Sequence, residues 1–226
     1  MQTILTRDFL APVLLTLRVS ITASVIVFFL GFAAAWWMVQ KKFPGKVFLE
    51  TLFMLPMVLA PTVVGFLLLV VLGKRGWIGI WIERLFKQTI LFTWWAAVIA
   101  AVVVSFPIVY QTMKTGLAAI DDELVAAARS IGANEWQLFR YVIVPLSFRT
   151  MLTAYIVGFV RSLGEFGATL MIAGNIPGKT QTVSTAIYLA IDTENMTLAW
   201  YLVGTMIVFS FLFLLIVNRK SNATIG

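Results

Sequence analysis

The stretch VIVFFLGFAAAWWMV (Val25–Val39) carries no charged side chain and belongs to an apolar run that extends from about Ala11 to Val39. An α-helix needs about 20 mostly apolar residues to cross the hydrocarbon core of a membrane. The run is too long for a cleaved signal peptide, and no small-x-small cleavage site precedes a polar chain. It therefore predicts a membrane-spanning helix near the N-terminus.

The composition places the whole chain in the same class. Of its 226 residues, 61% are hydrophobic and 12% are charged, and the mean hydropathy is +0.96. Soluble domains are about 25% charged and about 45–50% apolar. We therefore expect a single all-α integral membrane domain over residues 1–226.

The residue types that the chain lacks exclude several kinds of site. It has no cysteine and no histidine, which removes disulfides, thiolate metal sites, the commonest general base and the usual zinc and haem ligands. The net charge is +7, but the basic residues lie between apolar runs and not on one face. That arrangement is typical of residues beside a lipid bilayer and not of a nucleic-acid surface. We expect no metal site and no bound cofactor.

The hydropathy pattern predicts five spans. Aromatic residues gather near the ends of the runs, as in an interfacial belt: Trp36, Trp37, Trp94, Trp95, Trp200 and Tyr201. The predicted spans cover residues 11–39, 48–72, 92–113, 146–173 and 198–217.

An odd number of spans puts the two termini on opposite sides of the membrane. With the C-terminus in the cytoplasm, nine cations fall inside and six outside, which favours this orientation. The segment Arg75–Gln88 is too short and too charged to cross, so we expect an amphipathic helix at the outer surface. The inner set is Lys41, Lys42, Lys46, Lys114, Arg129, Arg140, Arg149, Arg219 and Lys220, and the outer set is Arg7, Lys74, Arg75, Arg84, Lys87 and Lys179.

The polar connection over residues 115–145 reads as two helices on the cytoplasmic side. Asp121 or Asp122 is suited to cap the first helix, which is rich in strong helix formers. Gly132 is expected to end it, because glycine readily adopts the left-handed conformation found just past a helix end. Asn134 then caps a second short helix, before Pro145 opens the fourth span.

The spacing A-A-A-R-S-I-G (Ala126–Gly132), nine further residues and V-I-V-P (Val142–Pro145) resembles the cytoplasmic loop of binding-protein-dependent ABC importer permeases. The family pattern is E-A-A-x-x-x-G-x9-I-x-L-P, and Ala126 replaces its glutamate. The resemblance implies the type I importer (MetI-like) fold, with coupling helices that dock on an ATP-binding subunit. The alternative is an ordinary amphipathic hairpin between two spans. The coupling residues so implied are Ala126, Ala127, Gly132, Ala133, Glu135, Trp136, Phe139 and Pro145.

Two further sequence blocks indicate which kind of importer permease the chain resembles. The block R-S-L-G-E-F-G-A (Arg161–Ala168) with the following G-N-I-P-G-K-T is similar to permeases for the tetrahedral oxyanions molybdate, tungstate and sulfate. The block Leu55–Gly79 resembles the second-span region of molybdate permeases, with Ala60 in place of the first proline of their L-P-P step. The short chain also fits molybdate permeases better than the longer sulfate permeases.

The segment GNIPGKT (Gly174–Thr180) looks at first like a phosphate-binding loop. Such a loop needs four residues between its glycines and follows a buried strand, whereas here three residues intervene and a membrane helix precedes. We interpret it as a turn at the outer mouth. Asn175, Lys179 and Thr180 would there meet the anion or its delivery protein, or serve only as a solvated loop.

Arg161 and Glu165 are charges within the predicted fourth span, on one helix face. Intramembrane charges are costly and usually face the protein interior. The pair is either a buried ion pair that holds helices together or a step on the anion path. The candidate path or gate residues are Arg161, Ser162, Gly164, Glu165, Gly167 and Thr169.

The sequence therefore predicts a non-catalytic importer subunit for molybdate in a prokaryotic plasma membrane, with tungstate or sulfate as alternatives. The resemblance implies a homodimer, two ABC ATP-binding subunits that hold ATP and magnesium, and an extracytoplasmic oxyanion-binding protein. Two other classes of membrane protein are the alternatives. A secondary transporter would show internal repeats, and a membrane-embedded enzyme would need a larger polar cluster than Arg161 and Glu165 supply.

Overall fold

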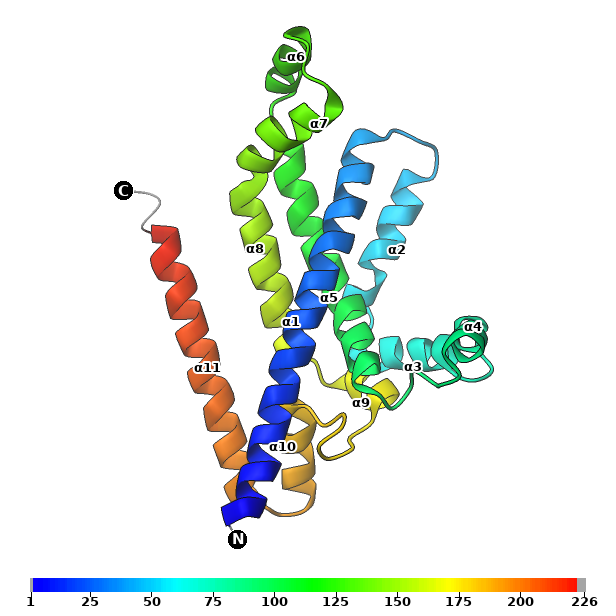
Figure 1. The fold of residues 1–226 in the computed structure, drawn as a ribbon, viewed down its shortest axis with the longest axis vertical. Coiled ribbons are helices and arrows are strands. Elements are labelled where there is room, and N and C mark those ends of the chain that lie inside the picture. The colour runs from blue at the N-terminus through cyan, green and yellow to red at the C-terminus, as the bar shows by residue number, and fades with distance from the viewer. Residues whose placement is uncertain (1, 223–226) are drawn as a thin grey trace.

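The computed structural model describes the backbone of residues 2–222 and the side chains of residues 8–85 and 87–215. Every regular element in this part of the chain is a helix, which confirms the all-α class. Figure 1 shows an elongated bundle with α6 and α7 at one end and α10 at the other. The elements are α1 (Gln2–Gln40), α2 (Lys46–Val58), α3 (Pro61–Leu72), α4 (Trp77–Phe86), α5 (Trp94–Ala118), α6 (Asp122–Ser130), α7 (Glu135–Leu138), the π-helix η1 (Phe139–Ile143), α8 (Val144–Leu163), α9 (Gly167–Ala173), α10 (Val183–Asp192) and α11 (Met196–Asn222).

Among the described residues, four continuous helices are long and apolar enough to cross a membrane: Asp8–Gln40, Trp94–Ala118, Glu135–Leu163 and Met196–Leu215. The first, third and fifth predicted spans each fall on one of them. The side chains of Arg7, Arg219 and Lys220, which entered the orientation argument, lie outside the described residues.

The second predicted span, residues 48–72, is not one helix. The chain direction bends by 115° between α2 and α3. Proline disfavours the helical conformation in the residue before it, and Ala60, which precedes Pro61, is extended with ψ 139°. Pro61 then occupies the first position of α3, where its missing N–H is not needed.

The fourth predicted span, residues 146–173, is also wrong as a single helix. α8 ends at Leu163, and a second short helix, α9, begins at Gly167. The break coincides with a side-chain cap, because Glu165 Oε1 accepts a hydrogen bond of 3.0 Å from Ala168 N at the start of α9. Because Glu165 lies in this break, Arg161 and Glu165 do not share one continuous helix.

Small residues bring α1, α5 and α8 close together in the centre of the bundle. A Cβ on Gly31 of α1 would lie 2.8 Å from Val109 Cγ1, and one on Gly158 of α8 would lie 2.8 Å from Val109 Cγ2. Helix association in lipid depends on such close backbone approach. By contrast, α11 packs mainly on α10, where Leu202 meets Val183 and Ala186, and runs along the outside of the bundle (Figure 1).

Candidate functional site

The hairpin α6–α7 has the helix, glycine turn, helix structure that the sequence predicts. Asp121 caps α6, since its Oδ1 accepts a 2.8 Å hydrogen bond from Glu123 N. Gly132 has φ +88°, which glycine adopts without steric cost. Asn134 and Gln137 form a capping box at α7, with backbone-to-side-chain hydrogen bonds of 2.8 and 2.9 Å.

The hairpin is held together as one unit and presents a partly apolar surface. Arg129 of α6 pairs with Glu135 of α7, with Nε 3.2 Å from Oε1 and Nη2 3.3 Å from Oε2. Ile131, Trp136 and Tyr141 are 88%, 66% and 70% exposed. Exposed aromatic side chains are enriched at protein interfaces, so this surface is suited to a protein partner.

The structure places all eight predicted coupling residues between α6 and the start of α8. Ala126, Ala127, Gly132, Glu135 and Trp136 are exposed on the hairpin, while Ala133 and Phe139 are half-buried. Pro145 lies further along, in the first turn of α8. Most of the predicted residues are therefore accessible on or beside the hairpin, and Pro145 lies apart from them in α8.

The junction between the hairpin and the membrane helix is a π-helix that the sequence analysis missed. Val144 N donates to Phe139 O, five residues earlier, and the helix continues without interruption from Glu135 to Leu163. Pro145 has no N–H and its ring would clash with the carbonyl four residues earlier in an α-helix. The wider π-turn relieves that clash, so Pro145 is the sequence feature that accounts for it.

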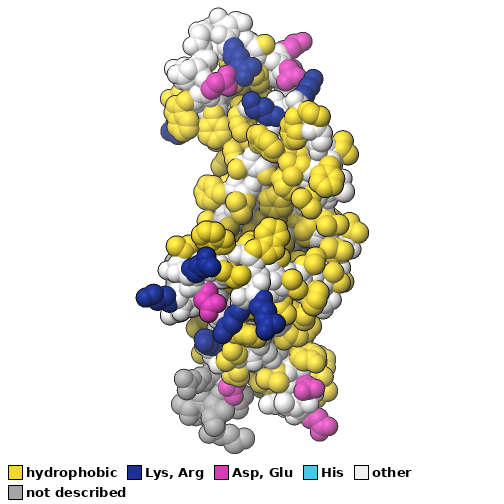
Figure 2. Space-filling view, turned by 90° about the vertical axis from the view of Figure 1, so that its right-hand side faces the viewer, with side chains coloured by type: hydrophobic (Ala, Val, Ile, Leu, Met, Phe, Trp, Pro, Cys, Tyr) yellow, Lys and Arg dark blue, Asp and Glu magenta, His cyan; other side chains and the backbone are white. Residues whose placement is uncertain are grey.

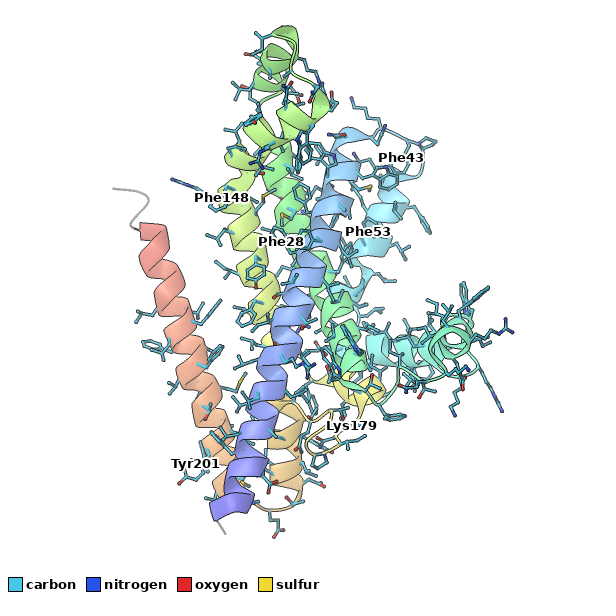
Figure 3. All side chains as sticks on the ribbon, in the orientation of Figure 1. Phe28, Phe43, Phe53, Phe148, Lys179 and Tyr201 are labelled. Atoms are coloured by element: carbon cyan, nitrogen blue, oxygen red, sulfur yellow. The ribbon has the colours of Figure 1, made fainter. Side chains whose placement is uncertain are left out.

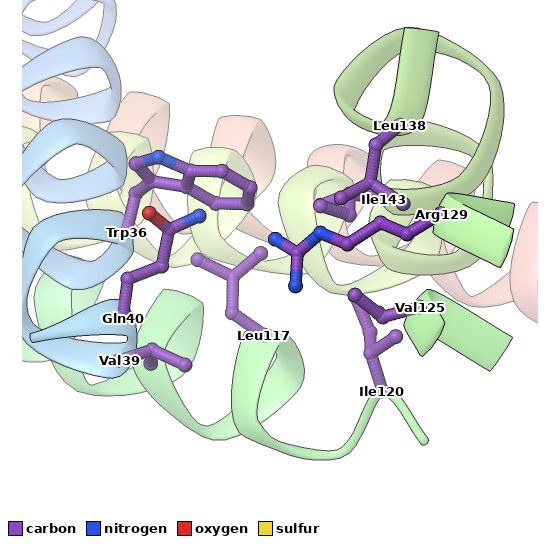
Figure 4. A pocket seen from close by; sticks show the side chains of 9 residues that line it. All are labelled: Trp36, Val39, Gln40, Leu117, Ile120, Val125, Arg129, Leu138 and Ile143. Carbon is purple, nitrogen blue, oxygen red and sulfur yellow. The ribbon is translucent and has the colours of Figure 1, made fainter. Parts of the chain in front are cut away.

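A hollow of about 270 Å³ separates the hairpin from the ends of α1 and α5. Figure 4 shows the Arg129 guanidinium extending across it toward Trp36 and Gln40. Its remaining wall is aliphatic: Val39, Leu117, Ile120, Val125, Leu138 and Ile143. Beside this hollow, Leu138 and Ile143 are buried in one hydrophobic cluster with Met38 of α1 and Met113 of α5, so the second half of the hairpin is packed on the bundle.

The break between α8 and α9 is organised by one ion pair. Arg161 Nη1 lies 3.0 Å from Glu165 Oε2, and the other oxygen of Glu165 caps α9 through Ala168 N. The Glu165 side chain is 3% exposed, whereas that of Arg161 is 35% exposed. The carboxylate is thus fixed by two partners, and the guanidinium retains an open side.

The two breaks in the predicted spans pack against each other. A Cβ on Gly167, at the start of α9, would lie 3.2 Å from both Pro61 Cβ and Thr62 N of α3. A Cβ on Gly65 would lie 2.8 Å from Ala168 Cα. The bend of α2–α3 and the break of α8–α9 therefore form one structure, which is a candidate gate.

The other predicted path residues are less accessible. Ser162 Oγ donates to Gly158 O at 2.8 Å and lies 3.1 Å from Ser105 Oγ of α5. Thr169 is 1% exposed and Gly167 is buried. Only Gly164 and, in part, Arg161 are open in this conformation.

The predicted outer mouth follows helix α9 and turns at Gly174 and Gly178, both with φ +71°. Thr180 is completely buried and its Oγ1 accepts from Ile176 N at 3.0 Å, so it stabilises the loop from within. Asn175 Nδ2 donates to Thr185 O at 3.3 Å. Lys179 is exposed on the loop between α9 and α10 (Figure 3).

Residues 10–221 match the family described as the binding-protein-dependent transport system inner membrane component. The chain belongs to this family. It is 51% identical over 215 residues, 95% of each chain, to YvgM of Bacillus subtilis (strain 168), whose name assigns it provisionally to molybdenum transport as a permease. It is 42% identical over 192 residues, 85% of this chain and 84% of the relative, to the molybdenum transport system permease protein ModB of Escherichia coli (strain K12).

A solved structure supports the fold. The chain aligns with a chain of the bacterial alginate ABC transporter in complex with an alginate pentasaccharide-bound periplasmic protein, with a TM-score of 0.76. The alignment covers 95% of this chain and 78% of the other, at 17% sequence identity. The chain is thus a multi-pass membrane protein of the permease type, and its relatives are named as permeases and not as enzymes.

Two charged contacts of this permease were not singled out from its sequence. Arg18 of α1 lies over the ring of Trp94, with its Cζ 4.1 Å from the ring centroid, a cation–π distance. Lys114 Nζ lies 2.7 Å from Glu50 Oε1 and joins α5 to α2. Arg18 lies within an apolar run, as Arg161 does, and a charge in such a run is the feature by which the sequence could have indicated this contact. Lys114 and Glu50 lie within or beside apolar runs as well.

Proposed function

We propose that this chain is the membrane-spanning subunit of an ATP-driven importer that carries molybdate into a bacterial cell. The observation that carries the proposal is the identity of 51% and 42%, over most of the chain, to permeases named for molybdenum transport. The proposed complex contains two copies of this chain, two ATP-binding subunits that hold ATP and magnesium, and an extracytoplasmic binding protein. The chain itself would hold no cofactor.

The hairpin α6–α7 would be the contact with the ATP-binding subunit. Its accessible apolar surface, its internal Arg129–Glu135 ion pair and its continuity with α8 support this role. This end of the molecule would face the cytoplasm. α11 runs towards the same end (Figure 1), which agrees with a cytoplasmic C-terminus in the plasma membrane.

Arg161 would be the residue that attracts the dianion, and Glu165 would limit how tightly it binds. Because Glu165 already neutralises Arg161 at 3.0 Å, the site would attract the anion weakly and release it. Weak binding suits translocation, since an anion held tightly at one point would not move on. The hydroxyls of Ser162 and Thr169 would become available only if the packed breaks separate.

The outer loop would receive the binding protein. Lys179 is its exposed cation, while Thr180 and Asn175 act within the loop. Discrimination among tetrahedral dianions would then reside in the binding protein, because the chain has no histidine or cysteine to distinguish them.

The test is ATP-dependent uptake of radiolabelled molybdate into proteoliposomes that contain this chain and its ATP-binding subunit, with the binding protein outside. We expect uptake only with all components, and competition by tungstate when the binding protein accepts it. Uptake driven by an ion gradient without ATP would identify a secondary transporter instead. Uptake of sulfate but not molybdate, with binding proteins that dock equally well, would reassign the substrate.

A further inference from the structure

Helix α4 carries an apolar stripe that nothing in the described chain covers. Trp77, Trp81 and Leu85 recur every four residues, which places them on one helix face, and they are 77%, 64% and 73% exposed. The opposite face packs on the end of α3. There a Cβ on Gly76 or Gly79 would collide with the carbonyl oxygens of Val71 and Gly73. These close contacts fix α4 with the stripe facing outward.

Four cations surround this stripe. Lys74, Arg75, Arg84 and Lys87 are all exposed, and Glu83 is the only acidic residue in the segment 74–87, so its net charge is 4 − 1 = +3. The Arg84 guanidinium lies 6.0 Å from the centroid of the Trp81 ring. Figure 2, which views the side from which α4 projects, shows Lys and Arg side chains grouped there among hydrophobic ones.

The orientation of α4 is that of a helix lying on a membrane. Figure 1 shows α4 crosswise to the long helices, at the level where α5 begins. α5 has 25 residues, or about 37 Å at 1.5 Å per residue, slightly more than the roughly 30 Å hydrocarbon core. α4 is therefore about one membrane thickness from the hairpin, at the level of the end of α5 that begins with Trp94 and Trp95.

We propose that α4 binds the anionic surface of the leaflet that lies farther from the hairpin. Trp77, Trp81 and Leu85 enter the boundary of the acyl chains, and the four cations bind lipid phosphates. A second copy of this chain would bring another +3 segment against the first and be repelled. An acidic protein surface would satisfy the cations but not the apolar stripe, whereas an anionic lipid surface satisfies both. This inference does not depend on which anion is transported.

The first experiment uses the absence of cysteine from the chain. A single Leu85→Cys in the full chain, labelled with an environment-sensitive fluorophore, is reconstituted in nanodiscs containing acyl-brominated lipid. We expect quenching of this label. A label on Ile131→Cys, also strongly exposed but on the hairpin, should not be quenched. Ile78→Cys on α4 replaces Leu85→Cys if that variant does not fold.

The second experiment tests the cations by native mass spectrometry of the chain with phosphatidylglycerol and phosphatidylcholine. Each cation near an anionic surface contributes about fivefold to binding. Lys74→Gln, Arg75→Gln, Arg84→Gln and Lys87→Gln should therefore each lower the preference for phosphatidylglycerol by about that factor. Lys179→Gln, an exposed cation outside α4, should not.

Three results would overturn the proposal. An unquenched label at Leu85→Cys would place α4 outside the membrane. Shielding of that label only after the binding protein is added would assign the surface to the delivery protein. Equal retention of the two lipids by the unmodified chain would remove the anionic preference.

Discussion

Pro61 and Pro145 both stand where an apolar helix would otherwise continue, yet the chain bends sharply at Pro61 and stays helical through Pro145. Ala60, before Pro61, is extended with φ −58° and ψ 139°. Val144, before Pro145, remains helical with φ −59° and ψ −48°. A proline therefore does not decide alone whether a helix breaks.

The difference lies in what holds the residues before each proline. Phe53 of α2 packs on α5, but Met57 and Val58 at the end of α2 are 59% and 82% exposed, so little packing opposes a break at Leu59 and Ala60. Before Pro145, Leu138 and Ile143 are buried against the ends of the bundle, and the capping box fixes the start of α7. There the chain keeps its helix and accommodates the proline with a π-turn. The result is a sharp bend at the candidate gate and one continuous helix, Glu135–Leu163, that joins the hairpin to the membrane span.

The largest expected effect comes from breaking the packing that the bend at Pro61 permits. Gly65→Val would place a side chain where a Cβ already lies 2.8 Å from Ala168 Cα. We expect a loss of about 1–3 kcal/mol of stability and little folded protein, measured by the thermal unfolding of the detergent-solubilised chain. Gly204→Val is the control, because its site in α11 has open space. Equal stability of the two variants would contradict the close packing of α3 and α9.

The second prediction concerns Gly132, in the turn between α6 and α7. Its φ of +88° is a conformation in which a β-branched residue is a strong outlier, at a cost of about 1–2 kcal/mol. Gly132→Val should displace the hairpin and uncouple ATP hydrolysis from uptake, or prevent assembly with the ATP-binding subunit, while the chain still reaches the membrane. Wild-type uptake by this variant would refute the coupling role of the hairpin.

Pro145→Ala removes the cause of the π-turn while leaving the residues of the hairpin unchanged. Closing the turn would shift the hairpin by one residue, a rotation of about 100° relative to α8. We expect uptake to fall by roughly tenfold with ATP hydrolysis retained. Pro56→Ala, in the interior of α2, should change the ratio of uptake to hydrolysis little. An unchanged ratio in Pro145→Ala would show that the π-turn has no part in coupling.

The smallest effect is expected at the ion pair beside the gate. Glu165→Gln keeps an oxygen that is able to cap Ala168 N but removes the charge that neutralises Arg161. Binding of radiolabelled molybdate to the purified complex should rise a few-fold and uptake should slow by a similar factor, since Arg161 then holds the anion. Lys179→Gln is the control variant, because it changes one charge in the outer loop and leaves the Arg161–Glu165 pair unchanged. Unchanged binding in Glu165→Gln would leave the pair with only a structural role.

The sequence predicted local features well where neighbouring residues decide the structure. The caps at Asp121 and Asn134 and the turn at Gly132 each depend on residues within one helical turn, and the structure confirms them. The membrane class followed from composition alone. These features also carried the family resemblance.

The bends could not be predicted from hydropathy, because both halves of each broken span are apolar. Whether Pro61 bends a helix depends on how α2 packs and on the contact of Gly65 with Ala168, more than 100 positions away along the chain. The burial of Thr180 likewise depends on how its loop closes on Ile176. Residue type alone suggested an accessible hydroxyl there.

The coupling role of the hairpin is tested most directly by its accessibility and its partner. Ile131→Cys, at a position that is 88% exposed, should be the only thiol in this cysteine-free chain. We predict that a membrane-impermeant thiol reagent labels it only after the membrane is opened. A bifunctional thiol cross-linker should then join it to the ATP-binding subunit, whereas Asn175→Cys should react in intact cells and not join that subunit. Labelling of Ile131→Cys in intact cells, or its failure to cross-link in an active complex, would show that the hairpin is not the cytoplasmic contact with the ATP-binding subunit.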